Sequence, residues 1–461
     1  MTTLTAPPPV ASIPRAPSSR IVSLDVLRGI AILGTLMTNI GIFLVKASES
    51  GSNGFDRFLG TFIGLTTDGK YIGLLTIMFG IGLEIQRQSA LKKGETWLGS
   101  YPWRAALLVL DGLLNYIFIF EFDVLMGYGL TALVVAVVVS KSPLVQKWCL
   151  GIGLALHVAH LTYLSAPGWF SSQTYTEESD AVDAKYAKAM ELAVGKGGDI
   201  SPVDMTPHQL DVYAKAIGRP AADILKEWQA YGAADGGTMH YWDQVHNRFT
   251  YFWGGRAEIP VMFLMGLGLF LVGAFLYRAG IFEAHGDKLR KRIMLLSFGV
   301  GLPIDWVTRI WFSDYTGTFN RYLTSTFVSF GILALVAHFY AKGRGLGIVG
   351  KGLTNIGKMA LTCYVGQNLI ASILFYGWGF DLSRYLTFGA WNTVIAWTMV
   401  AAILVVFSTV WLRYFKRGPI EWVWNISHTW ILKRTRPMIE RSNAKKALKQ
   451  AAQQRAALQE A

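Results

Sequence analysis

Charged residues, cysteine and histidine are all scarce in this chain of 461 residues. Only 16% of the residues are charged, whereas a soluble domain usually has about 25%. The two cysteines, Cys149 and Cys363, fall inside apolar runs, which is typical of small buried side chains rather than of a disulfide or a metal site. No histidine precedes His157 and no ligand-spaced motif is present, so we expect no bound metal.

Apolar residues, by contrast, are abundant. They account for 52% of the chain and recur in stretches long enough to span a bilayer, about 20 residues each. The stretches lie near residues 28–46, 68–86, 103–122, 124–140, 148–164, 258–280, 289–312, 320–341, 353–378 and 387–412. Frequent glycine inside them suits close helix packing in membranes. The sequence therefore predicts an all-α, polytopic integral membrane bundle of about ten transmembrane helices.

Basic residues indicate the orientation. The net charge is +13, but Lys and Arg lie in alternate short loops and in the C-terminal tail, so we expect no nucleic acid partner. By the positive-inside rule, we expect both termini of the chain to lie in the cytoplasm.

The predicted organisation has five parts. A disordered cytoplasmic tail (1–20) precedes helices 1–5 (21–164), a helical extracytoplasmic insertion (165–255), helices 6–10 (256–412) and a basic cytoplasmic tail (413–461). The insertion is either a lid without chemistry or part of a substrate site. In the tail, Trp422, Trp424 and Trp430 among basic residues predict a helix at the inner interface.

The first apolar stretch carries a polar stripe. Asp25 and Arg28 lie one turn apart on a helix, and Asn39 returns to nearly the same face about 16 Å deeper. Exposing these polar side chains to lipid would cost free energy, so this helix face should lie against other parts of the protein. The stripe is either a flanking charge pair with one interhelical amide, or part of a site.

Several motifs carry a resemblance to a known family. They are LDVLRGIAILGTLMTN from Leu24, TTDGKYIGLLTIMFGIGLEIQ from Thr66, FEFDVLMGYGL from Phe120, IGKMALTCYVGQNLI from Ile356 and WLRYFKRGPIEWVWN from Trp411. In order and spacing they resemble the YeiB-like family of bacterial inner-membrane proteins, whose C-terminal domain has no known function. The first motif is also similar to the acyltransferase-3 proteins and the heparan-α-glucosaminide N-acetyltransferases. The resemblance implies a superfamily that transfers acyl groups to envelope carbohydrates.

Two positions depart from the related patterns. Acyltransferase-3 proteins have a histidine, the presumed base, where this chain has Asn39, and the YeiB-like pattern usually has a histidine where this chain has Asn115. An amide is no general base. Asn39 therefore stays a candidate for binding the acceptor or stabilising an oxyanion.

The candidate acid–base groups lie nearer the outer surface. His157 and His160 share a helix face, and His240 and His246 precede the sixth span. With Asp68 or Asp123 they could form a base and its orienting carboxylate; the carboxylates could equally belong to solvated turns. Further intramembrane polar groups are Asp111 and the pair Asp305 and Arg309, four residues apart on one helix face.

The resemblance implies a protein of the bacterial inner (cytoplasmic) membrane. Together with these residues, it predicts an acyltransferase that takes an acyl group from acyl-coenzyme A inside and delivers it to an outward-facing envelope carbohydrate or lipid. Asp25 and Arg28 would bind the donor phosphates. The alternative is a small-molecule or lipid transporter or flippase with the same polar stripe lining its path. The lipid bilayer is the expected environment, and a homo-oligomer is left open.

Overall fold

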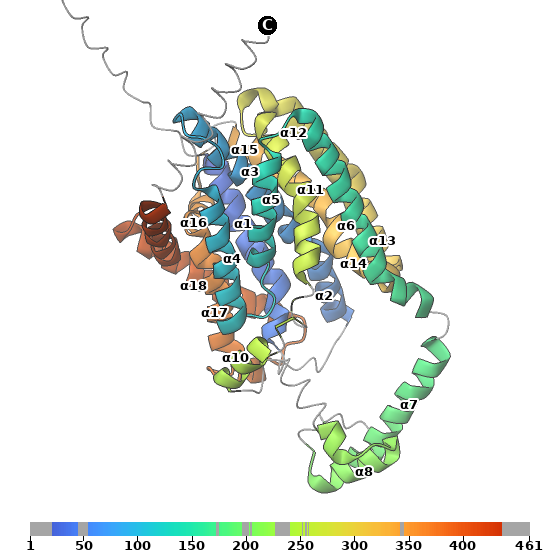
Figure 1. Cartoon of the computed structure of the whole chain (residues 1–461). Helices are drawn as coiled ribbons and strands as arrows, with labels where there is room; N and C mark the ends of the chain where they lie inside the picture. Colours follow the sequence, from blue (N-terminus) through green and yellow to red (C-terminus); the bar gives the residue numbers. More distant parts are fainter. Residues whose placement is uncertain are drawn as a thin grey trace, which may run out of the picture.

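The structure is a computed structural model that describes residues 21–44, 54–171, 175–195, 202, 205–225, 240–250, 252–253, 256, 258–341 and 345–435. These residues form helices, turns and loops and no strand, so the predicted all-α fold is confirmed (Figure 1). The predicted disordered tail at residues 1–20 lies outside the described residues.

Long helices form the bundle, and each predicted apolar stretch falls on one of them (Figure 1). They are α1 (Val22–Asn39), α3 (Lys70–Lys92), α4 (Tyr101–Phe118), α5 (Leu125–Val138), α6 (Pro143–Ser171), α11 (Glu258–Arg278), α12 (Asp287–Leu296) with α13 (Leu302–Trp311), α14 (Ser313–Phe319) with α15 (Ser325–Ala341), α17 (Ala360–Phe375) and α18 (Trp391–Tyr414). Among the described residues, six spans are long and apolar enough to cross a membrane, and α5 and α17 are shorter apolar helices. The chain is therefore a polytopic membrane protein.

The ninth predicted stretch is broken. α16 (Ile348–Lys358) ends before Met359, whose backbone is not helical, and α17 begins after it. α16 runs antiparallel to the first half of α1, because Gly29 approaches Leu353 while Gly357 approaches Asp25. A Cβ atom on Gly357 would lie 1.8 Å from the Asp25 carbonyl oxygen, so this contact requires glycine.

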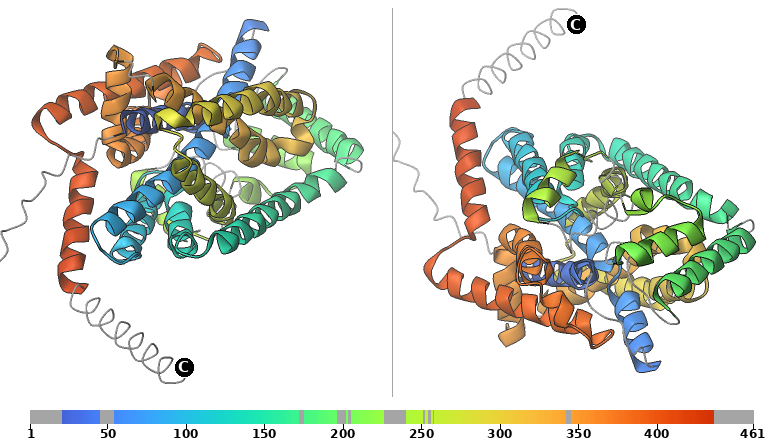
Figure 2. Two further views of the ribbon diagram at one scale, coloured as in Figure 1. Left: turned by 90° about the horizontal axis from the view of Figure 1, so that it is seen from above. Right: turned by 90° about the horizontal axis from the view of Figure 1, so that it is seen from below.

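The two ends of the bundle differ. At the insertion end lie α7 (Tyr175–Val194), α8 (Pro207–Ile217) and α10 (Tyr241–Thr250), together with α2 (Gly54–Thr67) (Figure 1). At the opposite end, here called the tail end, α1 begins and α18 ends. Residues 419–435 form a further helix, the tail helix, which turns away from α18 (Figure 2).

The first helix lies inside the bundle. Viewed along the bundle, α1 is surrounded by other helices, and it contacts α3, α15, α16 and α17 (Figure 2). Its side chains Leu27, Ile32 and Leu36 are fully buried. A stretch that is apolar on almost every side is buried in a bundle of this kind.

Two π-helical segments lie on either side of α13 and α14, and Asp305 is on α13. They are η4 (Ser297–Gly301), before α13, and η5 (Asn320–Thr324), before α15. A π segment frees backbone carbonyl groups from the regular helix pattern. Near the insertion end, side chains from other helices bond to carbonyl groups of η5, as described below.

Candidate functional site

A cavity of about 570 Å³ opens among α1, α3, α4, α5, α17 and the tail helix. Its floor is apolar and includes Ile32, Leu75, Met78 and Phe79. Most of its charged lining residues are basic. The basic residues are Arg28, Arg104, Lys358, Lys416 and Arg417, and the acidic one is Glu421. The cavity therefore combines a cationic rim with an apolar interior, which suits an anionic amphiphile.

Arg28 reaches this cavity from the first turns of α1. Its Nη1 donates to Asp25 Oδ1 at 3.3 Å, and the Asp25 side chain is 3% exposed. The predicted one-turn pair is thus formed, with the carboxylate inside the bundle and the guanidinium at the cavity. Their predicted role in binding a donor remains a proposal.

Asp123 lies just beyond the cavity, in the connection between α4 and α5. Its Oδ2 accepts from Asn115 Nδ2 at 2.8 Å, and its Oδ1 accepts from the Leu125 amide at 2.9 Å. Leu125 and Tyr364 line the cavity. Burial raises the pKa of the Asp123 carboxyl to about 6. A carboxyl group with a raised pKa can take up and release a proton near neutral pH.

Asp111 lies one helical turn before Asn115 on α4. Its Oδ2 is buried and has no hydrogen-bond partner among the described residues. Asp111, Asn115 and Asp123 are therefore a group of polar side chains on α4 and the α4–α5 connection, and they do not line the cavity itself.

Two arginines contact the α4–α5 connection next to this group. Arg256 Nη2 donates to the Asp123 carbonyl at 3.1 Å, and its guanidinium lies 4.3 Å from the Tyr116 ring centroid. Arg248 donates to the Glu121 carboxylate at 2.8 Å. Both arginine side chains are buried. Buried polar groups thus lie between the cavity-lining residue Leu125 and the insertion end.

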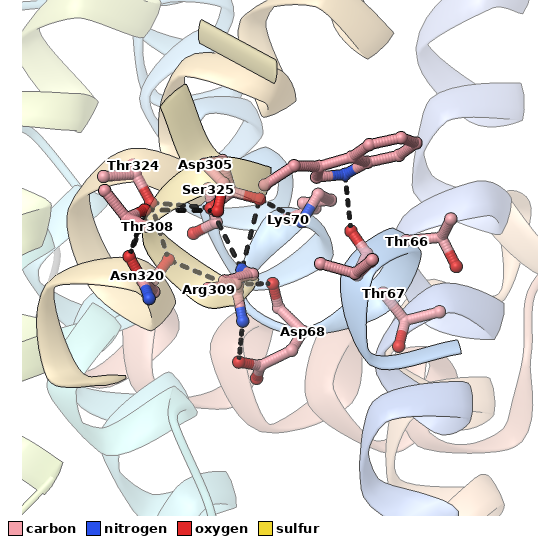
Figure 3. A network of polar contacts seen from close by, with 12 residues as sticks. Thr66, Thr67, Asp68, Lys70, Asp305, Thr308, Arg309, Asn320, Thr324 and Ser325 are labelled. Atoms are coloured by element: carbon pink, nitrogen blue, oxygen red, sulfur yellow. Dashed lines mark hydrogen bonds and ion pairs between the residues drawn. The ribbon is translucent and has the colours of Figure 1, made fainter. Parts of the chain in front are cut away.

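A second polar network, also toward the insertion end, is shown in Figure 3. Lys70 Nζ lies 2.7 Å from Asp305 Oδ2, and Arg309 Nε lies 3.1 Å from Asp305 Oδ1. Arg309 and Arg321 both pair with the Asp68 carboxylate, at 2.7 and 3.0 Å. The predicted Asp305–Arg309 contact is present, and it belongs to a larger network that fastens α3 to α13 and η5.

The carbonyl groups of η5 complete this network. The Asn320 carbonyl accepts from Arg309 at 2.9 Å, and the Tyr322 carbonyl lies 3.2 Å from His157 Nε2. His157 is buried on α6, and its neighbour His160 stacks on Tyr163 with ring centroids 6.5 Å apart.

The other two candidate histidines lie elsewhere. His240 directly precedes α10, and His246 lies on α10, with its Nε2 3.5 Å from the Thr250 hydroxyl. α10 packs on α4, whereas α6 packs on α11 and α14. The structure therefore places the two pairs of histidines on helices that pack against different neighbours. Among the described residues, no group of three His, Cys, Asp or Glu side chains could hold a metal ion.

Asn39 is the last residue of α1. The preceding Thr38 donates to the Thr67 carbonyl at 3.3 Å, so this end of α1 lies beside the turn that carries Asp68. Asn39 thus lies about 16 Å along α1 from Arg28, toward the insertion end, and it is not among the residues that line the tail-end cavity.

Sequence reasoning missed several of these residues. Arg104 on α4, and Lys416, Arg417 and Glu421 after α18, were not singled out, because no local motif marks a cavity built from distant helices. Lys70 and Arg321 were also missed as partners of Asp305 and Asp68. In the sequence, Lys70 and Arg321 are marked only as charged residues at the ends of apolar stretches.

The fold and these polar groups define a polytopic, all-α membrane protein with a basic cavity at one end. A family model described as "Protein of unknown function (DUF418)" matches residues 276–430. The "Uncharacterized protein YeiB" of Escherichia coli (strain K12) is 28% identical over 430 residues, which cover 88% of this chain and 95% of that protein. The "Uncharacterized protein YxaH" of Bacillus subtilis (strain 168) is 25% identical over 425 residues, 89% of this chain and 94% of that protein. These matches support the YeiB-like resemblance of the sequence motifs and extend the similarity over nearly the whole chain. No solved structure matches it.

Proposed function

We propose that this protein is a transmembrane acyltransferase that binds acyl-coenzyme A in the tail-end cavity and passes the acyl group to an acceptor on the other side of the membrane. The observation that carries the proposal is the pairing of a cationic rim with an apolar interior in one cavity of about 570 Å³. The basic loops support a cytoplasmic position for the tail end, where acyl-coenzyme A is found, and the resemblance supports the inner membrane.

The rim suits the donor's phosphates. Arg28 offers a planar fork for bidentate contacts to phosphate oxygens, and Asp25 holds that guanidinium in place. Arg104 is fixed by Gln86, with a distance of 2.8 Å between its Nη1 and the amide oxygen. The apolar floor formed by Met78, Phe79 and their neighbours would then take the acyl chain.

Asp123 is the best placed of the six candidate acid–base residues. It adjoins the cavity through Leu125, it is buried, and Asn115 orients its carboxylate. As a general base it would accept the proton of an acceptor hydroxyl while the hydroxyl oxygen forms a bond to the thioester carbon. The carbon–sulfur bond then breaks, and the proton passes to the departing thiolate. The acceptor, an envelope carbohydrate or lipid, would arrive along the path lined by Arg256 and Arg248.

The alternative function is a transporter or flippase. The observation that favours it is the buried pair of Lys70 and Asp305, because ionisable groups inside a membrane bundle often mark a transport pathway. A transporter would move its substrate without any covalent product, whereas an acyltransferase leaves an acylated acceptor.

The decisive experiment measures acetyl- and palmitoyl-coenzyme A binding to the purified protein in nanodiscs. Arg28→Lys should weaken binding about tenfold, the effect of losing about 1.4 kcal/mol of bidentate contact. Arg384→Lys is the matched control, because Arg384 pairs with Asp381 at the insertion end and its side chain is 54% exposed. An unchanged affinity of Arg28→Lys for acyl-coenzyme A would contradict a donor site at Arg28. Substrate flux in proteoliposomes without an acylated product would favour the transporter.

A further inference from the structure

The tail helix has two unlike faces. Glu421, Trp424 and Asn425 line the cavity. The opposite face exposes large apolar side chains to the surroundings of the protein. They are Trp422, Val423, Ile426 and Trp430. The tail helix is therefore one wall of the cavity and at the same time an apolar surface that no described part of the protein covers.

Glu421 fastens this wall to α17. Its Oε1 accepts from the amides of Leu361 at 2.7 Å and Thr362 at 3.1 Å, and its Oε2 bonds to the Thr362 hydroxyl. These amides belong to the first turn of α17, where donors lack partners within the helix and the helix dipole favours a negative charge. Glu421 thus caps α17 from a different helix.

The chain before Glu421 is shaped for this contact. A Cβ atom on Gly418 would lie 2.2 Å from Glu421 Oε2 and 2.5 Å from the Thr362 hydroxyl oxygen. The Ile420 amide donates to the same hydroxyl at 3.1 Å. Glycine at 418 is what lets the backbone approach α17 so closely.

The middle of the tail helix rests on the far side of the cavity. The Arg104 guanidinium of α4 lies 5.5 Å from the Trp424 ring centroid. His428 stacks on Trp424 with ring centroids 5.6 Å apart and is 5% exposed. The tail helix therefore bridges the cavity from α17 to α4.

The exposed face fits one environment, the headgroup region of an anionic leaflet. The tail helix begins a few residues after the membrane-spanning helix α18 ends at Tyr414, so the chain places it at the membrane boundary. Trp422 and Trp430 are 60% and 55% exposed there. Arg413, Lys416, Arg417, Lys433 and Arg434 add positive charge around them. Tryptophan beside basic residues is the composition of an interfacial helix that binds anionic lipid.

We propose that the tail helix is a lipid-anchored gate of the cavity: its apolar face lies in the anionic leaflet, and Glu421 is the latch that holds the gate closed on α17. The gate uses the same cavity as the proposed function, but it does not require acyl transfer. Opening would separate Glu421 from Thr362 and Trp424 from Arg104, and this would expose the apolar floor of the cavity to a ligand.

The latch is tested by the reactivity of a cysteine inside the cavity. Met78 lines the cavity floor and is 3% exposed, so Met78→Cys is introduced after Cys149→Ser and Cys363→Ser. The full-length protein, in nanodiscs of phosphatidylcholine and phosphatidylglycerol, is treated with a water-soluble maleimide and no acyl-coenzyme A. We expect Glu421→Ala to raise the alkylation rate about tenfold, equivalent to about 1.4 kcal/mol of gate stability.

Two variants accompany Glu421→Ala. Glu421→Gln keeps an oxygen that can accept from the α17 amides, so its rate should lie between the wild-type and alanine values. Glu283→Ala removes an exposed carboxylate elsewhere on the protein and should leave the rate unchanged. An unchanged rate in both Glu421 variants, or an equal rise in Glu283→Ala, would overturn the latch.

The lipid contact is tested by a spin label at Val423→Cys. We expect high collision with oxygen and low collision with a water-soluble nickel complex, compared with a label at the exposed loop residue Glu95. Replacing phosphatidylglycerol by phosphatidylcholine should also speed alkylation at residue 78. Equal nickel accessibility at 423 and 95 would overturn the lipid anchor. If acyl-coenzyme A does not bind but the gate responds as described, the proposed function fails and the gate stands.

Discussion

Lys70 shows how this protein keeps charge inside an apolar bundle. Its side chain is 2% exposed and its partner Asp305 is fully buried. Asp305 also accepts from Arg309 and from the Thr324 hydroxyl, at 2.6 Å for the latter. A buried charge is tolerated only when its partner and further hydrogen bonds replace the lost water. Removing one member of such a pair should therefore be more harmful than removing both.

This reasoning gives a prediction for stability. Lys70→Met should destabilise the folded protein by about 3–5 kcal/mol, since it leaves Asp305 with less compensation. Lys70→Met combined with Asp305→Asn should cost less than the sum of the two single variants. The measurement is thermal unfolding in nanodiscs. The control is Lys215→Met, which breaks the exposed pair with Asp211 and should change stability by at most about 0.5 kcal/mol. Additive costs for Lys70 and Asp305 would contradict the coupling.

Asp123 gives a prediction for pH dependence. Burial raises its folded-state pKa to about 6 from the ordinary value of 3.8. The native protein therefore binds this proton more tightly than the unfolded chain, and the stability gained at low pH is lost as the pH rises through 6. Asp123→Asn has no such charge. As the pH rises from 4 to 7, the melting temperature of Asp123→Asn should therefore increase relative to that of the wild type. The melting temperature of Asp211→Asn, a variant at an exposed position, should not change relative to the wild type. A difference that is constant with pH would contradict this account.

At the scale of elements, α3 and α11 cross unusually closely. A Cβ atom on Gly80 would lie 2.2 Å from the Phe270 carbonyl oxygen, and one on Gly273 would lie 2.3 Å from the Ile77 carbonyl oxygen. Small residues permit this approach of two backbones, as in other membrane helix pairs. The crossing links the two halves of the chain across the insertion.

Gly80→Ala should force α3 and α11 apart and destabilise the protein by about 1–3 kcal/mol, the usual cost of overpacking. Gly151→Ala is the matched control, because a Cβ atom there meets nothing within 4 Å. Both variants also gain helix propensity of similar size, so the difference between them isolates the crossing. Thermal unfolding of the two variants in the same lipid provides the measurement. Equal stability would show that the crossing can relax without cost.

The sequence predicted the helices well because long apolar stretches are the strongest local signal a membrane protein has. It could not predict the break at Met359, since that break depends on α16 lying antiparallel to α1, with Gly357 against Asp25. The Asp25–Arg28 and Asp305–Arg309 contacts were predictable from helical spacing. The cavity and the Lys70–Asp305 pair join residues distant in the chain, and the four histidines lie on helices whose packing no local pattern shows.

For the whole molecule, the remaining prediction is the orientation in the membrane. The structure places the start of α12, with its basic residues, at the end opposite α7 and α8 (Figure 1). Because basic loops stay in the cytoplasm, Lys288 at the start of α12 should face inward and Lys215 on α8 should face the periplasm. In a background without Cys149 and Cys363, an impermeant maleimide added to intact spheroplasts should label Lys215→Cys but not Lys288→Cys. Permeabilised cells are the control, since both cysteines should then react. Labelling of residue 288 alone in intact spheroplasts would invert the topology, and the tail-end cavity could then no longer take its donor from the cytoplasm.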